Sequence, residues 1–178
     1  MKKLDLRKLT LNAMMIAMVL LVTYLTPFKI IPQGYINLGD IAIFIAAIVL
    51  GRKSGFIAGA IGSSLADIAL GYVFYAPTTF LVKGMEGYIA GLIGYAFKYE
   101  KVSYASVVIG VIAGAVWMVL GYFVSEAFIL NYFVPGFGLA TALNNVLGNL
   151  IQAAISAIAA PVIFAYLVKF TRLRSFVE

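Results

Sequence analysis

The stretch IAIFIAAIVLGRKSGFIAGAIG, residues 41–62, contains the pattern that decides the fold: an apolar run, the basic pair Arg52 and Lys53, and a second apolar run. The same alternation continues along the chain. Eleven of the thirteen Lys and Arg residues fall in four short clusters separated by long apolar segments. The clusters are Lys2/Lys3/Arg7/Lys8, Arg52/Lys53, Lys98/Lys101 and Lys169/Arg172/Arg174.

The composition indicates an integral membrane protein. Hydrophobic residues make up 63% of the chain and charged residues 11%, which is too little polar surface to cover a water-soluble fold. The net charge of +6 does not indicate nucleic-acid binding, because the basic residues lie at the ends of apolar runs. We interpret them as orientation signals and contacts with anionic lipids. The chain has no Cys and no His, which excludes disulfides, thiolate metal sites and the usual general base.

Basic clusters favour the cytoplasmic side of a membrane, so the number of spans between successive clusters is even. Six spans with both termini cytoplasmic satisfy this condition. We therefore predict an all-α integral membrane bundle of six transmembrane helices, forming one domain over residues 1–178. The second run is shorter than the roughly 20 residues of a straight span, so we expect it to be extended at its outer end or to sit partly within the protein. The expected helices are 9–25, 41–50, 55–71, 79–97, 104–128 and 141–170.

Polar side chains within the expected spans lie toward their outer ends. Glu86 and Asn149 lie roughly 10 Å below the outer ends of their helices, at about 1.5 Å per residue, and Asp67 is closer to the outer end of the third helix. Ionisable groups in a bilayer are costly unless they face a cavity or pair with one another. This distribution predicts a pocket that opens outward above a closed apolar floor.

Residues three and four apart share one face of a helix, so these polar residues form stripes. Carboxamides both donate and accept hydrogen bonds, which suits a neutral ligand with ring nitrogens and hydroxyls. Trp117 and Glu126 lie near opposite faces of an ideal helix, so we expect one of them to reach the pocket. An aromatic wall is expected from Trp117, Tyr122, Tyr75 and Phe137. The stripes are Thr79/Lys83/Glu86, Asn145/Asn149/Gln152/Ser156 and Ser63/Ser64/Asp67.

Each of these patterns also has a structural interpretation. Lys83 and Glu86 would form an ion pair within the membrane, with Lys83 reaching toward the outer headgroups. The amides of the sixth helix would link neighbouring helices by hydrogen bonds. Asp67 would cap a neighbouring loop or neutralise Lys83.

The first helix is expected to present a partner-binding surface. Ala13 and Ala17 are small residues at a spacing that permits close helix approach, and the opposite face is expected to carry Met14, Met15 and Met18, which repack easily. The sequence has no G-x-x-x-x-G-K-[ST] motif and no evident ion relay. We infer a subunit that captures a solute and depends on partners to release it inside, with no cofactor in this chain.

Several motifs resemble the substrate-capture components of energy-coupling factor vitamin importers, and most closely those assigned to hydroxymethylpyrimidine or pyridoxine. The resemblance implies a non-enzymatic six-helix subunit of a prokaryotic plasma membrane, which binds a vitamin at the outer face. It also implies a transmembrane coupling protein and two ATPase subunits as partners, with docking through Ala13 and Ala17. The matching segments are Ile36 to Asp40, Gly59 and Gly62 to Ser64 with Asp67, Ala76 to Thr79, Lys83 to Gly87, and Gly91.

On this basis Lys83 and Glu86 would supply polar contacts, Asn145 and Asn149 would recognise ring substituents, and an aromatic residue would stack on the ring. The loops 27–38 and 132–138 would act as lids. One alternative is the same role for riboflavin, which needs a larger cavity, or for another vitamin. The others are a self-sufficient secondary transporter or channel, and an intramembrane enzyme using Asp67 or Glu86.

Overall fold

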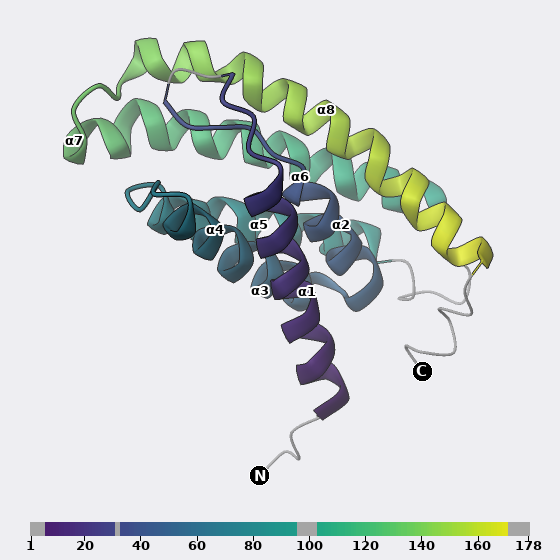
Figure 1. Ribbon diagram of the computed structural model, residues 1–178. Helices are drawn as coiled ribbons and strands as arrows, with labels where there is room; N and C mark the ends of the chain where they lie inside the picture. Colours follow the sequence, from purple (N-terminus) through teal and green to yellow (C-terminus); the bar gives the residue numbers. More distant parts are fainter. Residues whose placement is uncertain (1–5, 31–32, 96–102, 171–178) are drawn as a thin grey trace.

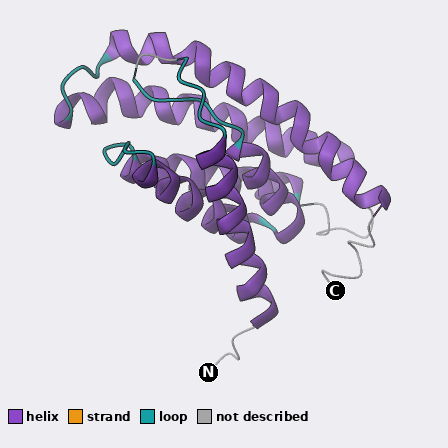
Figure 2. Cartoon of the chain, in the orientation of Figure 1, coloured by secondary structure: helices purple, strands orange, loops and turns teal. Residues whose placement is uncertain are grey.

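The computed structural model describes residues 6–30, 33–95 and 103–170. Within these ranges the secondary structure is helical (Figure 2). The only β-type pairing among the described residues is an isolated bridge between Phe28 and Ile36. The predicted cytoplasmic residues Lys2, Lys3, Lys98, Lys101, Arg172 and Arg174 lie outside the described residues.

In the described part of the chain the helices form six rods, as predicted, and Figure 1 shows how they are arranged. Two of the rods are composite. The third rod contains a π-helical segment, η1, between α3 and α4, and the fifth contains η3 between α6 and α7. In order, the elements are α1 (Leu6–Leu25), α2 (Gly39–Leu50), α3 (Arg52–Ile57), η1 (Ala58–Gly62), α4 (Ser63–Ala69), α5 (Ala76–Gly94), α6 (Tyr104–Val124), η3 (Ser125–Leu130), α7 (Asn131–Phe133) and α8 (Leu139–Phe170).

Three rods within the described ranges are long and apolar enough to cross a membrane by length and composition. They are Leu6–Leu25, Tyr104–Phe133 and Leu139–Phe170. Exposed large apolar residues follow the outer faces of the last two, including Ile112, Val116 and Leu120, and Leu143, Leu147 and Ile158. Apolar residues outside and polar residues inside are the arrangement expected when lipid is the solvent.

The short helix α2 lies inside the bundle, which confirms the expectation that residues 41–50 sit partly within the protein. Its twelve residues rise only about 18 Å. It contacts α1, α3, α5 and α8, and most of its side chains are buried. The bundle therefore surrounds α2, and the residue that begins its first turn, Asp40, is placed in the interior.

Helix α5 packs closely against the third rod because glycines face each other across the contact. A Cβ on Gly55 would lie 2.6 Å from the carbonyl oxygen of Gly87, and a Cβ on Gly91 would lie 2.7 Å from the Cα of Arg52. Neither position has room for a larger residue. This backbone contact brings the polar stripes of the two rods side by side along one interior space.

Helix α1 lies at the edge of the bundle and buries only Val19 and Thr23. Ala13, Met14, Ala17 and Met18 are exposed, and Met15 packs against the buried cluster around Val19. The prediction that the methionines form one face opposite the alanines is therefore wrong. Residues i and i+1 are about 100° apart on a helix, so the exposed alanines and Met14 and Met18 form one broad surface.

Candidate functional site

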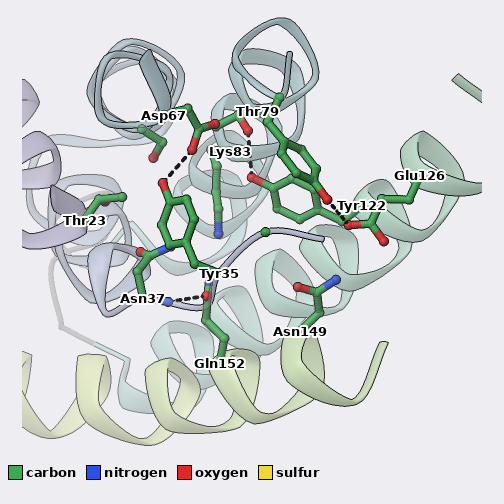
Figure 3. A pocket seen from close by; sticks show the side chains of 13 residues that line it. Thr23, Tyr35, Asn37, Asp67, Thr79, Lys83, Tyr122, Glu126, Asn149 and Gln152 are labelled. Atoms are coloured by element: carbon green, nitrogen blue, oxygen red, sulfur yellow. Dashed lines mark hydrogen bonds between the residues drawn. The ribbon is translucent and has the colours of Figure 1, made fainter. Parts of the chain in front are cut away.

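A polar cavity lies at one end of the bundle, among the ends of several rods (Figure 3). Its walls come from the last turns of α1, from α4 and from the first half of α5. The end of the fifth rod, the first half of α8 and the loop between α1 and α2 complete it. The lining residues are Thr23, Gly34, Tyr35, Asn37, Ser63, Asp67, Tyr75, Thr79, Lys83, Tyr122, Glu126, Asn149 and Gln152.

The bundle is apolar beyond the cavity, toward the end that carries Arg52, Lys53 and Lys169. A buried cluster there includes Phe44, Ile48, Val107, Val111 and Phe164. The predicted arrangement of a polar pocket above an apolar floor is thus present in the described part of the chain. That the pocket end faces outward stays a prediction from the basic clusters.

Lys83 lies at the base of the cavity between two carboxylates. Its ammonium group forms an ion pair with Asp40 and lies 3.1 Å from Glu86 Oε2. All three side chains are almost completely buried, with exposed fractions of 2%, 1% and 0%. Tyr122 covers the ammonium group, which lies 5.5 Å from the centre of its ring. The expected ion pair of Lys83 and Glu86 is therefore present, and Asp40 extends it.

Two further carboxylates line the upper part of the cavity, and each accepts a hydrogen bond from a tyrosine. Tyr35 donates to Asp67 Oδ1, and the Tyr75 hydroxyl lies 2.8 Å from Glu126 Oε1. Burial and the Asp67 charge raise the pKa of the Tyr35 hydroxyl, so it remains a donor at neutral pH. Asp67 thus holds the neighbouring loop, which was one of the two structural roles expected for it.

The loop between α1 and α2 crosses the cavity and is bound to several elements. The Asn37 backbone N–H donates to Gln152 Oε1 at 2.7 Å, and Gln152 Nε2 donates to Asp40 at 2.8 Å. The Gln33 carbonyl accepts from Asn145 Nδ2 at 3.1 Å. The loop is therefore tied both to α8 and, through Gln152, to the buried charges.

The cavity is nearly filled by its own side chains. The space open to the centres of water-sized spheres is about 30 Å³, roughly twice the minimum that holds one water. Any vitamin therefore requires the loop or the surrounding side chains to move.

The structure brings together four of the seven residues that we predicted to bind substrate. Lys83, Tyr122, Asn149 and Asp67 line the cavity. Glu86 lies directly behind Lys83, and Asn145 is buried where it holds the loop. Their roles in binding stay predictions.

Trp117 is placed differently from the other predicted residues. Its indole Nε1 donates to the Val82 carbonyl at 3.2 Å, and it is not among the residues that line the cavity. Glu126 does line it. The expectation that only one of the two reaches the pocket is therefore confirmed, and Glu126 is that residue.

The residues of the site that were not predicted as substrate-binding include three with ionisable side chains, Asp40, Tyr35 and Glu126. Asp40 could have been found from the sequence. It stands at the start of an apolar run that is too short to span a membrane, and such a run is expected to be buried together with the carboxylate. Glu126 lies in η3, and a π-helical turn changes the direction of the side chains that follow. Residue spacing on an ideal helix does not contain that information.

The chain is similar to known membrane transporter components. A model of the family of ECF-type riboflavin transporter S components matches residues 3–169. An uncharacterized protein of Pyrococcus woesei, encoded in the gap 3′ region, is 40% identical over 114 residues, which cover 64% of this chain and 72% of the relative. The family consists of membrane transporter components and not of enzymes. With nearly its whole length matched, the chain belongs to the family of S components of ECF-type riboflavin transporters.

Proposed function

We propose that this chain captures a small heteroaromatic B-vitamin or vitamin precursor at the outer face of a prokaryotic plasma membrane. Hydroxymethylpyrimidine or pyridoxine is the favoured ligand. The observation that carries the proposal is the gathering of buried polar side chains from five rods and one loop around a cavity at one end of the bundle. Membership of the S component family supports the same role, since such components bind vitamin-type substrates.

In this proposal the ring of the ligand lies beside Tyr122, and Asn149 recognises one of its edges. Lys83 presents its ammonium group from below, held in place by Asp40 and Glu86. Asn145 acts through the loop that it binds. The loops 27–38 and 132–138 close over the ligand, and the hydrogen bonds from Tyr35 and Asn37 support such a role for the first of them.

Delivery depends on partners. S components work with a module of membrane and ATPase subunits, and we propose a transmembrane coupling protein and two ATPases for this chain. The exposed surface of Ala13 and Ala17 on α1 supports a docking role, because it leaves room for the backbone of a partner helix.

Riboflavin is the second candidate, and the description of the matching family favours it. Either ligand requires the loop or the surrounding side chains to move, and a three-ring flavin requires a larger displacement than a one-ring ligand. Mass spectrometry of the small molecule that copurifies with the protein separates the two. Flavin absorbance in the purified protein would favour riboflavin and contradict the one-ring proposal.

Binding by variants tests the site itself. We expect Glu86→Ala and Asn149→Ala each to weaken affinity for the copurifying ligand by about 10-fold, since each removes a polar contact or its support. Titration calorimetry of the purified variants measures this, with the lipid-facing Leu143→Ala as the control. Wild-type affinity in both variants would contradict the assignment of the site.

A further inference from the structure

The acidic residues of the described part of the chain are distributed very unevenly. All four of them, Asp40, Asp67, Glu86 and Glu126, are buried around the one cavity, with exposed fractions of at most 5%. Lys83 is the one buried basic residue in the same ranges, and the others, from Arg7 to Lys169, are exposed. Among the described residues, the region of the cavity therefore holds four carboxylates and one ammonium group.

That ammonium group is already engaged. Lys83 contacts both Asp40 and Glu86 at the base of the cavity. Among the described residues, Asp67 and Glu126 have no ion-pair partner. These two carboxylates come from different walls, α4 and η3, and both face the cavity (Figure 3).

Each of these two carboxylates keeps one buried oxygen without a hydrogen bond within the described structure: Asp67 Oδ2 and Glu126 Oε2. Thr79 is a further polar neighbour of Asp67, and Asn145 of Glu126. The Thr79 hydroxyl hydrogen-bonds to Tyr122 and the Asn145 amide donates to the Gln33 carbonyl, so neither satisfies the two open oxygens. Glu126 also has to share its donor. The Tyr75 hydroxyl has one proton and lies within hydrogen-bonding distance of both Glu126 Oε1 and the Gln33 carbonyl oxygen, which is 2.7 Å from it. A buried acceptor without a donor destabilises the protein, because it has lost its hydrogen bond to water and gained none in return.

A third unpaired group lines the cavity from α8. Asn149 Nδ2 is buried and has no hydrogen-bond partner in the described part of the chain. Asn149 is on α8, which contacts η3, and both side chains line the cavity. The cavity thus presents an acceptor on η3, a donor on the neighbouring α8 and a second acceptor on α4.

We infer that the site selects a neutral or cationic heterocycle and rejects anionic forms of the same molecule. N–H or O–H donors of the ligand are directed at Asp67 and Glu126, and a ligand acceptor is directed at Asn149. The inference rests on the proposed function. An amino group beside a ring nitrogen, or a ring N–H beside a carbonyl, meets the requirement. A phosphate ester would place a like charge beside two buried carboxylates, where the surrounding dielectric is low.

The test compares each candidate vitamin with its own phosphate ester, using calorimetry on the purified full-length protein. The pairs are hydroxymethylpyrimidine, pyridoxine and riboflavin, each with its monophosphate. For the parent that binds, we expect the ester to bind at least about 100-fold more weakly, which corresponds to the loss of two favourable contacts. Equal or tighter binding of the ester overturns the inference and leaves the proposed function standing. Binding of none of the six overturns both.

Two isosteric variants test the residues. Asp67→Asn and Glu126→Gln remove a charge and keep the shape. We expect each variant to bind the parent vitamin about 10- to 100-fold more weakly. We also expect the ratio between the Kd of the ester and the Kd of the parent to decrease. The control, Asn144→Asp, adds a carboxylate on the exposed face of α8 and should leave both values unchanged. An unchanged preference in both site variants would contradict the assignment. The comparison in the wild-type protein stands even if a variant does not fold.

Discussion

At the scale of single residues, the most consequential feature is the position of Lys83 between Asp40 and Glu86. A buried charge is tolerated only where partners replace the water it has lost. The two carboxylates do this for Lys83, and Gln152 satisfies the remaining oxygen of Asp40. The group therefore stabilises the meeting of α2, α5 and α8 only while all its members are present.

Replacing Lys83 tests this dependence. Lys83→Met leaves two buried carboxylates without a counter-charge, so we expect the free energy of unfolding to fall by about 3–5 kcal/mol. Thermal unfolding in detergent measures the change. Lys53→Met, at an exposed position, should alter stability by less than about 0.5 kcal/mol. Adding Asp40→Asn to Lys83→Met should recover part of the loss, and no recovery would show that the charges are not its cause.

At the scale of secondary-structure elements, the bundle depends on glycines that let α5 approach the third rod. A Cβ at position 55 would also lie 2.7 Å from the Cβ of Ala47, so the space is closed on two sides. The contact positions both the Lys83 stripe and the Asp67 stripe. The glycine contact therefore affects the site indirectly, by setting the positions of the side chains that line it.

Adding one methyl group tests the contact. We expect Gly55→Ala to destabilise the protein by about 1–3 kcal/mol, because backbone atoms on the facing helix cannot yield. At Gly121 the nearest atom to an added Cβ is a side-chain methyl of Val82, at 3.0 Å. Gly121→Ala should be much milder, since that side chain can shift and alanine favours the helix. Equal losses in calorimetric unfolding would argue against close packing at Gly55.

At the scale of the whole molecule, the two ends of the bundle have different chemistry. One end holds the polar cavity, and the other holds an apolar core and exposed basic residues. Helix α1 runs along the side with little of its surface buried. This division supports capture at one end and separate docking along α1.

Bulky substitutions on α1 test whether capture and delivery are separable. We expect Ala13→Trp and Ala17→Trp to retain ligand affinity within about 2-fold, because neither residue contacts the cavity, and to abolish uptake by blocking helix approach. Vitamin uptake by cells that express the full transporter measures delivery. Leu143→Trp, on the exposed face of α8, should retain both binding and uptake. Normal uptake in both α1 variants would refute docking at this surface.

The sequence by itself determined the class of protein, the six helical rods and the faces that carry polar residues. Asn145, Asn149, Gln152 and Ser156 are all buried, as their spacing predicted. Such features follow from composition and from periodicity within one helix, which are local properties. The same motifs also carried the correct family, although not the identity of the vitamin.

Only the tertiary structure decided which polar groups meet. The pairs Lys83 with Asp40, Tyr35 with Asp67 and Tyr75 with Glu126 join elements separated by 43, 32 and 51 residues. No helical spacing relates such positions, because their contact depends on how the rods cross and on the π-helical turns within two of them. The position of Trp117 outside the cavity lining also depends on how the helices pack. Local periodicity specifies which face of a helix is polar, and packing between helices specifies which partner it faces.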